Sequence, residues 1–300
     1  MTTGRLRCAV AFGWLVAGLA PTAFAACPPA GEDATSLAAL KNGGFEIADV
    51  ARRDALAMAL VDCLASIDPA LRDGVAYEAL QRWMRAGSLP PERLRALRTR
   101  LYATLDAPDS DGVARPFAAL VLSEVARTDR VAPWMTVEER DAMVVRAAVY
   151  LISVDDYRGY ERGVGWRHGV AHGADWAMQL ALNPGLDRAQ LDRLRDAIAV
   201  QAVPEAAHAY VFGEPERLAR PLLFIAKRGV YDENDWSAWL AALSTRLGDP
   251  ALAWKDPAWL ARRHDLSALL QALYLEADLD EDPGIARLRP GVLAALKRLP

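Results

Sequence analysis

The fold class is decided by a stretch in the middle of the chain, Thr136-Val137-Glu138-Glu139-Arg140-Asp141-Ala142-Met143-Val144-Val145-Arg146-Ala147-Ala148-Val149-Tyr150-Leu151. Its first four residues form a capping box, in which the Thr136 hydroxyl and the Glu139 carboxylate each accept a hydrogen bond from an unpaired backbone amide. The apolar residues that follow recur at helical spacing: Met143, Val144, Ala147 and Leu151. The stretch therefore predicts a helix with one apolar face.

The same signals recur on both sides of this stretch. Asp187 and Gln190 repeat the capping box, and Asp68 precedes a proline at the first position of another predicted helix. Alternating β-branched runs, which are typical of strands, are nearly absent. The sequence therefore predicts an all-α protein with further helices over 47–64, 69–87, 90–105, 117–127, 166–180, 191–200, 215–227, 232–247, 257–278 and 291–298, and one starting at 204.

Short Gly, Pro and Asp turns join these helices, which favours antiparallel helical hairpins stacked side by side as a helical-repeat solenoid or toroid. The sequence has no exact repeat period, so a compact irregular bundle is the alternative. No Gly/Ser-rich linker or charge run divides the chain. We therefore expect a single helical domain over residues 27–300.

The first 26 residues have the pattern of a signal peptide. Arg5 and Arg7 supply the positive start, Cys8 to Leu19 form a short apolar run, and Ala23-Phe24-Ala25 resembles a cleavage site. Because the apolar run is short for a membrane span, a retained anchor is the lesser alternative. This pattern predicts export, with the periplasm as the destination and no transmembrane segment after processing.

Two cysteines, Cys27 and Cys63, remain after removal of residues 1–26. An oxidising compartment favours a disulfide bond between them, which would stabilise the fold by about 3 to 4 kcal/mol in the chain-entropy model. Ala25-Ala26-Cys27 also resembles the end of a lipobox, so a lipid anchor on Cys27 is the alternative.

The charge balance bears on the class of partner. The chain has 35 basic and 39 acidic residues, and residues 1–26 contain two arginines and no acidic residue, so removing them changes the net charge from −4 to −6. Nucleic acids and anionic membranes attract clustered positive charge. The composition therefore argues against a nucleic-acid partner and favours an envelope protein, peptide or glycan.

Residues 155–176 combine glycines, aromatic rings and titratable groups more densely than the rest of the chain. If residues 166–180 are helical, His168, His172 and Asp175 project from one helix face and could hold a divalent metal such as zinc. Asp156 and Arg158 complete the set of catalytic candidates. We expect Arg158, Tyr160 and Trp166 to contact a substrate, with Arg158 orienting an anionic group.

A structural role explains the same residues. Buried histidines are commonly satisfied by carboxylates or backbone carbonyls, and Arg158 would then close a buried network. The chain has no Gly-x-Ser-x-Gly elbow, phosphate-binding loop, dinucleotide fingerprint or Cys-x-x-Cys motif. The familiar enzyme families that carry these motifs are therefore excluded.

Part of this region resembles a known family. Arg158-Gly159-Tyr160 and Gly165-Trp166-x-His168-x-x-Ala171-His172-Gly173-Ala174-Asp175 are similar to the signature of bacterial helical proteins catalogued as domain of unknown function 2785, and residues 115–120 resemble an earlier helix of that family. Val154 and Arg167 depart from the family pattern, and the first departure weakens any carboxylate-pair mechanism. The resemblance implies an all-α fold and no assigned activity.

Two functions follow from these observations. The first is a cell-envelope binding or scaffold protein, in which the His, Asp and Arg side chains hold the central helices in register. The second is a metal-assisted or acid/base hydrolase that acts on an envelope component through His168, His172 and Asp175. The absence of catalytic motifs favours the first.

Overall fold

The computed structural model describes residues 27–300, so the predicted signal peptide over residues 1–26 lies outside the described residues. The helices and strands have the following bounds: α1 (Ala34–Asn42), α2 (Val50–Ala59), the 3₁₀ helix η1 (Asp62–Ala65), α3 (Pro69–Leu71), the π-helical η2 (Arg72–Tyr77), α4 (Glu78–Arg85), α5 (Pro91–Asp106), α6 (Ala114–Val131), α7 (Val137–Ser153), β1 (Tyr160–Glu161), β2 (Gly165–Trp166), α8 (Gly169–Ala181), α9 (Arg188–Ala202), α10 (Glu214–Lys227), α11 (Glu233–Thr245), the 3₁₀ helix η3 (Pro250–Leu252), α12 (Pro257–Leu279) and α13 (Pro283–Arg298).

The all-α prediction is confirmed. Within residues 27–300 the only sheet is an antiparallel hairpin in which Tyr160 pairs with Trp166 and Glu161 pairs with Gly165. Both predicted capping boxes are present, at Thr136 with Glu139 and at Asp187 with Gln190. These local hydrogen bonds fix where α7 and α9 begin.

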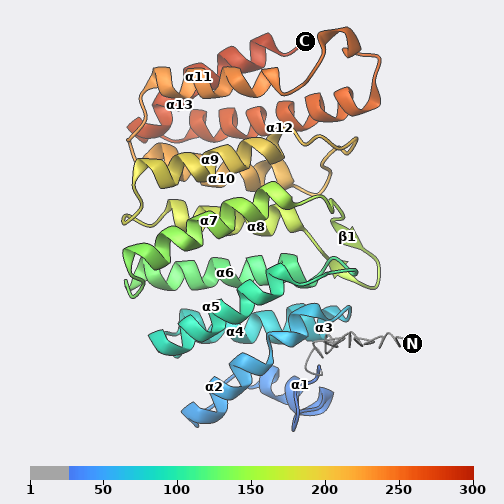
Figure 1. Cartoon of the computed structure of the whole chain (residues 1–300), viewed down its shortest axis with the longest axis vertical. Coiled ribbons are helices and arrows are strands. Elements are labelled where there is room, and N and C mark those ends of the chain that lie inside the picture. Colours follow the sequence, from blue (N-terminus) through green and yellow to red (C-terminus); the bar gives the residue numbers. More distant parts are fainter. Residues whose placement is uncertain (1–26) are drawn as a thin grey trace, which may run out of the picture.

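The helices lie across the long axis of the molecule and run from α1 and α2 at one end to α11 and α13 at the other, with α12 next to α10 (Figure 1). Helix α8 contacts α6 on one side and α10 on the other, and α10 contacts α12. Helix α7 contacts both α8 and α9. The buried apolar cluster runs from Leu37 to Ala295. A helical-repeat solenoid or toroid is consistent with this arrangement and stays a prediction.

One predicted helix, starting at 204, is absent, and two helix starts were predicted wrongly. Residues 203–213 form a loop, because Asp265 and Glu214 accept the backbone N–H groups of Tyr210 and Phe212. The helix expected from Trp166 begins at Gly169, since Trp166 belongs to β2. The helix expected from Gly291 begins at Pro283 and continues through Pro290.

The predicted disulfide is present between Cys27 and Cys63. It ties the start of the described chain to η1, where Cys63 is buried. A lipid on Cys27 would need the same sulfur atom, so this bond and the lipid-anchored alternative exclude each other. None of the helices in residues 27–300 is long and apolar enough to cross a membrane.

Candidate functional site

Helix α8 carries two of the predicted site residues, His172 and Asp175, through the core, and His168 directly precedes it. Every residue from Gly169 to Ala177 is buried. A Cβ atom on Gly173 would lie 2.7 Å from Leu151 Cδ2, so only glycine lets α8 approach α7 this closely. Gly173 lowers the intrinsic stability of the helix, and in return it allows α8 to pack closely against α7.

His168 precedes α8 in a left-handed conformation, with a φ of 55°. Its Nε2 lies 3.1 Å from the carbonyl oxygen of Phe212, and Nδ1 of His172 lies 3.2 Å from that of Pro116. Because a carbonyl only accepts, each ring nitrogen donates. The two rings lie 6.1 Å apart, with that of Trp166 stacked on His168 at 4.3 Å.

Burial controls the charge of both histidines. Desolvation lowers the pKa of His168 and lowers that of His172 well below its usual value of 6.5. The positive charge of Arg217 lowers both pKa values further. Both imidazoles are therefore neutral at neutral pH, and the single N–H of each ring is donated to a backbone carbonyl.

Asp175 is held by an arginine from another helix. Its Oδ1 accepts a hydrogen bond of 2.9 Å from Arg217 Nε, and its Oδ2 accepts a second from Arg217 Nη2. Desolvation raises the pKa of Asp175, and Arg217 opposes that rise. The bidentate pair joins α8 to α10 and occupies both carboxylate oxygens.

The predicted metal ligands are not assembled as a set. Within residues 27–300, no group of three or more His, Cys, Asp or Glu side chains is placed to hold a metal ion. His168 and His172 lie together, whereas Asp175 is turned to Arg217. The side chains present therefore do not fit a divalent metal with these three ligands.

The other predicted candidates lie on the loop between α7 and α8. Arg158 pairs with Asp156, with Nε and Oδ1 2.9 Å apart, and the Arg158 side chain is 48% exposed. Tyr160 and Trp166 are exposed on the hairpin. The structure thus divides the predicted cluster into a buried part on α8 and an exposed part on the hairpin loop, and Arg158 does not enter the buried network.

Sequence reasoning missed three buried charged residues beside this cluster. Arg72 is fully buried and donates to the carbonyl oxygens of Val164 and Trp166. Glu214 lies 3.6 Å from His168 Nε2, and Asp265 has a pKa raised to about 7 by burial. All three come from segments distant in sequence, so no local spacing could have pointed to them.

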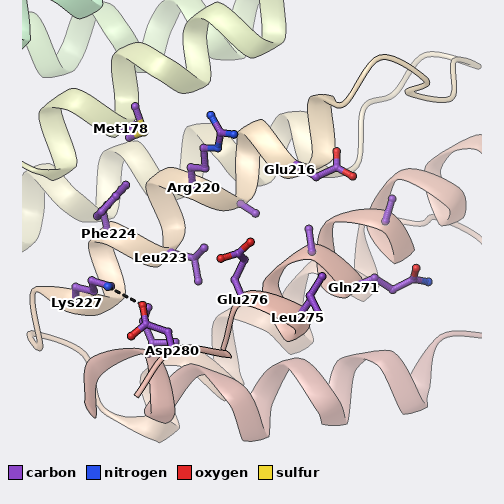
Figure 2. Close-up of a pocket in the computed structure, with 14 residues that line it drawn as sticks. Met178, Glu216, Arg220, Leu223, Phe224, Lys227, Gln271, Leu275, Glu276 and Asp280 are labelled. Atoms are coloured by element: carbon purple, nitrogen blue, oxygen red, sulfur yellow. Dashed lines mark ion pairs between the residues drawn. The ribbon is translucent and has the colours of Figure 1, made fainter. Parts of the chain in front are cut away.

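An open groove of about 710 Å³ lies between α10 and α12 (Figure 2). Its apolar lining includes Met178 of α8, Leu223 and Phe224 of α10, and Leu275 of α12. An ion pair between Lys227 and Asp280, 2.6 Å long, closes one end. The Glu276 carboxylate lies near the middle of the groove in Figure 2.

Comparison with known proteins gives one match. A family model described as "Protein of unknown function (DUF2785)" matches residues 101–275, which include α6 to α10 and the whole of the hairpin loop. No curated protein and no solved structure matches the chain. The match spans more than half of the chain and contains the residues that carried the resemblance. The chain therefore belongs to the DUF2785 family of proteins of unknown function.

Proposed function

We propose that the protein is an exported binding protein of the cell envelope, which holds a segment of a partner protein in the groove between α10 and α12. The observation behind this proposal is a contrast between α8 and the groove: charged side chains are paired in the first and partly unpaired in the second. The buried Asp175 carboxylate is paired with Arg217, whereas three charged residues of the groove, Glu216, Arg220 and Glu276, form no ion pair among residues 27–300.

The groove has the size and lining of a binding site. Its volume of about 710 Å³ lies in the range of about 300 to 1,000 Å³ that is common for ligand sites, and such sites are lined mainly by apolar groups. Leu275 is 58% exposed on the rim, while Leu223 is buried on the floor. An apolar segment of a partner would contact Leu223 and remove the exposed Leu275 side chain from water.

The charges of the groove define the partner further. Among residues 27–300, Glu216, Arg220 and Glu276 form no ion pair, so one cation faces two carboxylates. A partner segment with a lysine or arginine next to apolar residues complements that excess negative charge. An amphipathic helix laid into the groove would present both kinds of side chain from one face.

The hydrolase alternative has less support. Asp175 has both oxygens bonded to Arg217, and His172 is buried against Phe117 with ring centroids 5.1 Å apart. An acid/base residue must reach a substrate proton at hydrogen-bond distance. The contacts of this cluster instead link α8 to α6, to α10 and to the loop at Phe212.

The test is a fluorescence-anisotropy titration with a labelled amphipathic peptide of leucines and lysines, run beside the same peptide with glutamates in place of lysines. We expect saturable binding of the lysine peptide only, weakened on the order of tenfold by Glu216→Gln with Glu276→Gln. Glu233→Gln, an exposed change on α11, is the matched control and should bind like the wild type. Equal binding of both peptides, or no effect of the double change, would overturn the proposal.

A further inference from the structure

The exposed part of the predicted cluster forms a second concave surface, separate in its residues from the groove. It encloses about 400 Å³ between the hairpin loop and the loop that precedes α10. The residues that line it are Tyr157, Arg158, Gly159, Tyr160, Glu161, His208 and Phe212. We call this surface the hairpin pocket; Figure 1 labels β1, one strand of the hairpin, at the edge of the helix stack.

Aromatic rings dominate the hairpin pocket. Tyr160 is 55% exposed and Phe212 is 36% exposed. Trp166 does not line the pocket but is 38% exposed beside it, and its ring stands edge-on to both, with centroid distances of 5.2 Å to Tyr160 and 5.8 Å to Phe212. Three aromatic side chains thus keep surface in contact with solvent, although burying them would be favourable.

The charged groups around the pocket neutralise one another. Arg158 is paired with Asp156, and Glu161 is paired with Arg167. Neither charged lining residue therefore offers an unpaired charge to an ionic ligand, yet their planar groups still offer hydrogen-bond donors and acceptors. The pocket therefore combines exposed aromatic faces with neutralised polar groups.

Buried contacts hold the aromatic platform in place before any ligand arrives. Arg72, fully buried, donates to the carbonyl oxygens of Val164 and Trp166 at 2.7 and 3.3 Å. Gly159 has no side chain, and a Cβ atom there would overlap the Phe212 ring. A platform that is fixed in advance loses little conformational entropy when it binds.

We propose that the hairpin pocket binds a neutral glycan, with the apolar C–H face of a sugar ring on the Tyr160 and Phe212 rings and its hydroxyl groups hydrogen-bonded to the Arg158 and Glu161 side chains. A neutral sugar chain offers both an apolar ring face and uncharged hydroxyls, which matches this combination. The inference is independent of the groove, because no residue lines both surfaces. A protein with both sites would connect a glycan to a partner protein.

The test is isothermal titration of the full mature chain with two uncharged probes, an N-acetylglucosamine tetrasaccharide and maltotetraose. We expect saturable binding of at least one probe, weakened on the order of tenfold by Tyr160→Ala. Trp254→Ala is the matched control, because Trp254 is also exposed, at 62%, and contacts Arg263 rather than the hairpin. Its affinity should equal that of the wild type.

A second variant keeps the test decisive if Tyr160→Ala disturbs the hairpin. Phe212→Leu retains an apolar side chain on the other loop and removes the flat ring, so it should weaken binding in the same direction while the thermal midpoint stays near that of the wild type. Absence of binding by both probes, or equal affinity in all variants, would overturn the glycan site. Either result would leave the peptide titration at the groove unaffected.

Discussion

The buried end of α8 and the groove beside it use charged residues in opposite ways. On α8, Asp175 is paired with Arg217, and His172 donates to a backbone carbonyl. In the groove, Glu216 and Glu276 have no ion-pair partner among residues 27–300. A buried charge without a partner is costly, whereas an exposed one is not, so the first set must serve the fold and the second is free to serve a ligand.

The largest expected effect comes from breaking the buried pair. Arg217→Ala leaves the Asp175 carboxylate buried without its partner and should reduce the free energy of unfolding by about 3 kcal/mol, the lower end of the range for such pairs, because the Arg217 side chain is 28% exposed. Urea unfolding followed by circular dichroism measures this change. Arg220→Ala, one turn along α10, removes only a weaker attraction to Asp175 without a hydrogen bond, so it should stay within about 0.5 kcal/mol of the wild type. Similar losses in both variants would erase the distinction between the two regions.

Removing one imidazole should have the next largest effect. His172→Ala leaves the Pro116 carbonyl without its donor and opens space beside Phe117, so we expect a loss of about 2 kcal/mol in the free energy of unfolding. His264→Ala, an exposed change on α12, should be nearly neutral in the same experiment. A stable, fully folded His172→Ala protein would instead indicate that this histidine is kept for chemistry.

The pH dependence of stability sharpens the comparison. The pKa of His172 is well below 6.5 in the folded chain, so below pH 6.5 the unfolded chain binds a proton that the folded chain does not. This contribution lowers the stability on acidification by up to about 1.4 kcal/mol per pH unit. The stability advantage of the wild type over His172→Gln should therefore shrink between about pH 7.5 and about pH 5.5. A constant gap across this window would show that His172 is not desolvated.

The wild type must be compared with His172→Gln because Asp265 changes the stability with pH in the opposite direction to His172. Its pKa is raised from 3.8 to about 7, so its contribution to stability is present at low pH and is lost as the pH rises through about 7. A pH–stability curve of the wild type by itself therefore mixes the opposing contributions of His172 and Asp265. Subtracting the His172→Gln curve removes the part that comes from Asp265.

The smallest effect is expected in the groove. Glu216→Gln with Glu276→Gln removes two charges that make no ion pair within residues 27–300, so the free energy of unfolding should change by less than about 0.5 kcal/mol. Thermal unfolding at low and high salt measures it. A loss comparable to that of Arg217→Ala would mean that the groove charges also support the fold.

Local signals in the sequence predicted most of the helices and both capping boxes, because the groups that stabilise them lie within a few residues of one another. The loop at 203–213 was missed because the carboxylate that accepts the Tyr210 N–H comes from Asp265, 55 residues away. The last helix was expected to begin at Gly291, after Pro290, yet α13 runs through this proline, because burial of Leu288 and Val292 on either side outweighs its missing hydrogen bond.

The candidate site shows the same limit. Glycines and histidines at 168–175 indicated the right helix, because their spacing is a property of α8 itself. The partner of Asp175 could not be identified, since Arg217 is 42 residues away and several nearer arginines were equally plausible. Arg158 was expected in the buried network, and the short loop holds it instead against Asp156, two residues before it.

Binding is thus assigned to the groove, and stability to the buried end of α8. The most direct test is the affinity of the lysine peptide for two variants, Glu216→Gln with Glu276→Gln and His172→Gln. We expect binding on the order of tenfold weaker for the groove variant and wild-type affinity for folded His172→Gln. Loss of binding in His172→Gln, with unchanged affinity in the groove variant, would contradict this assignment.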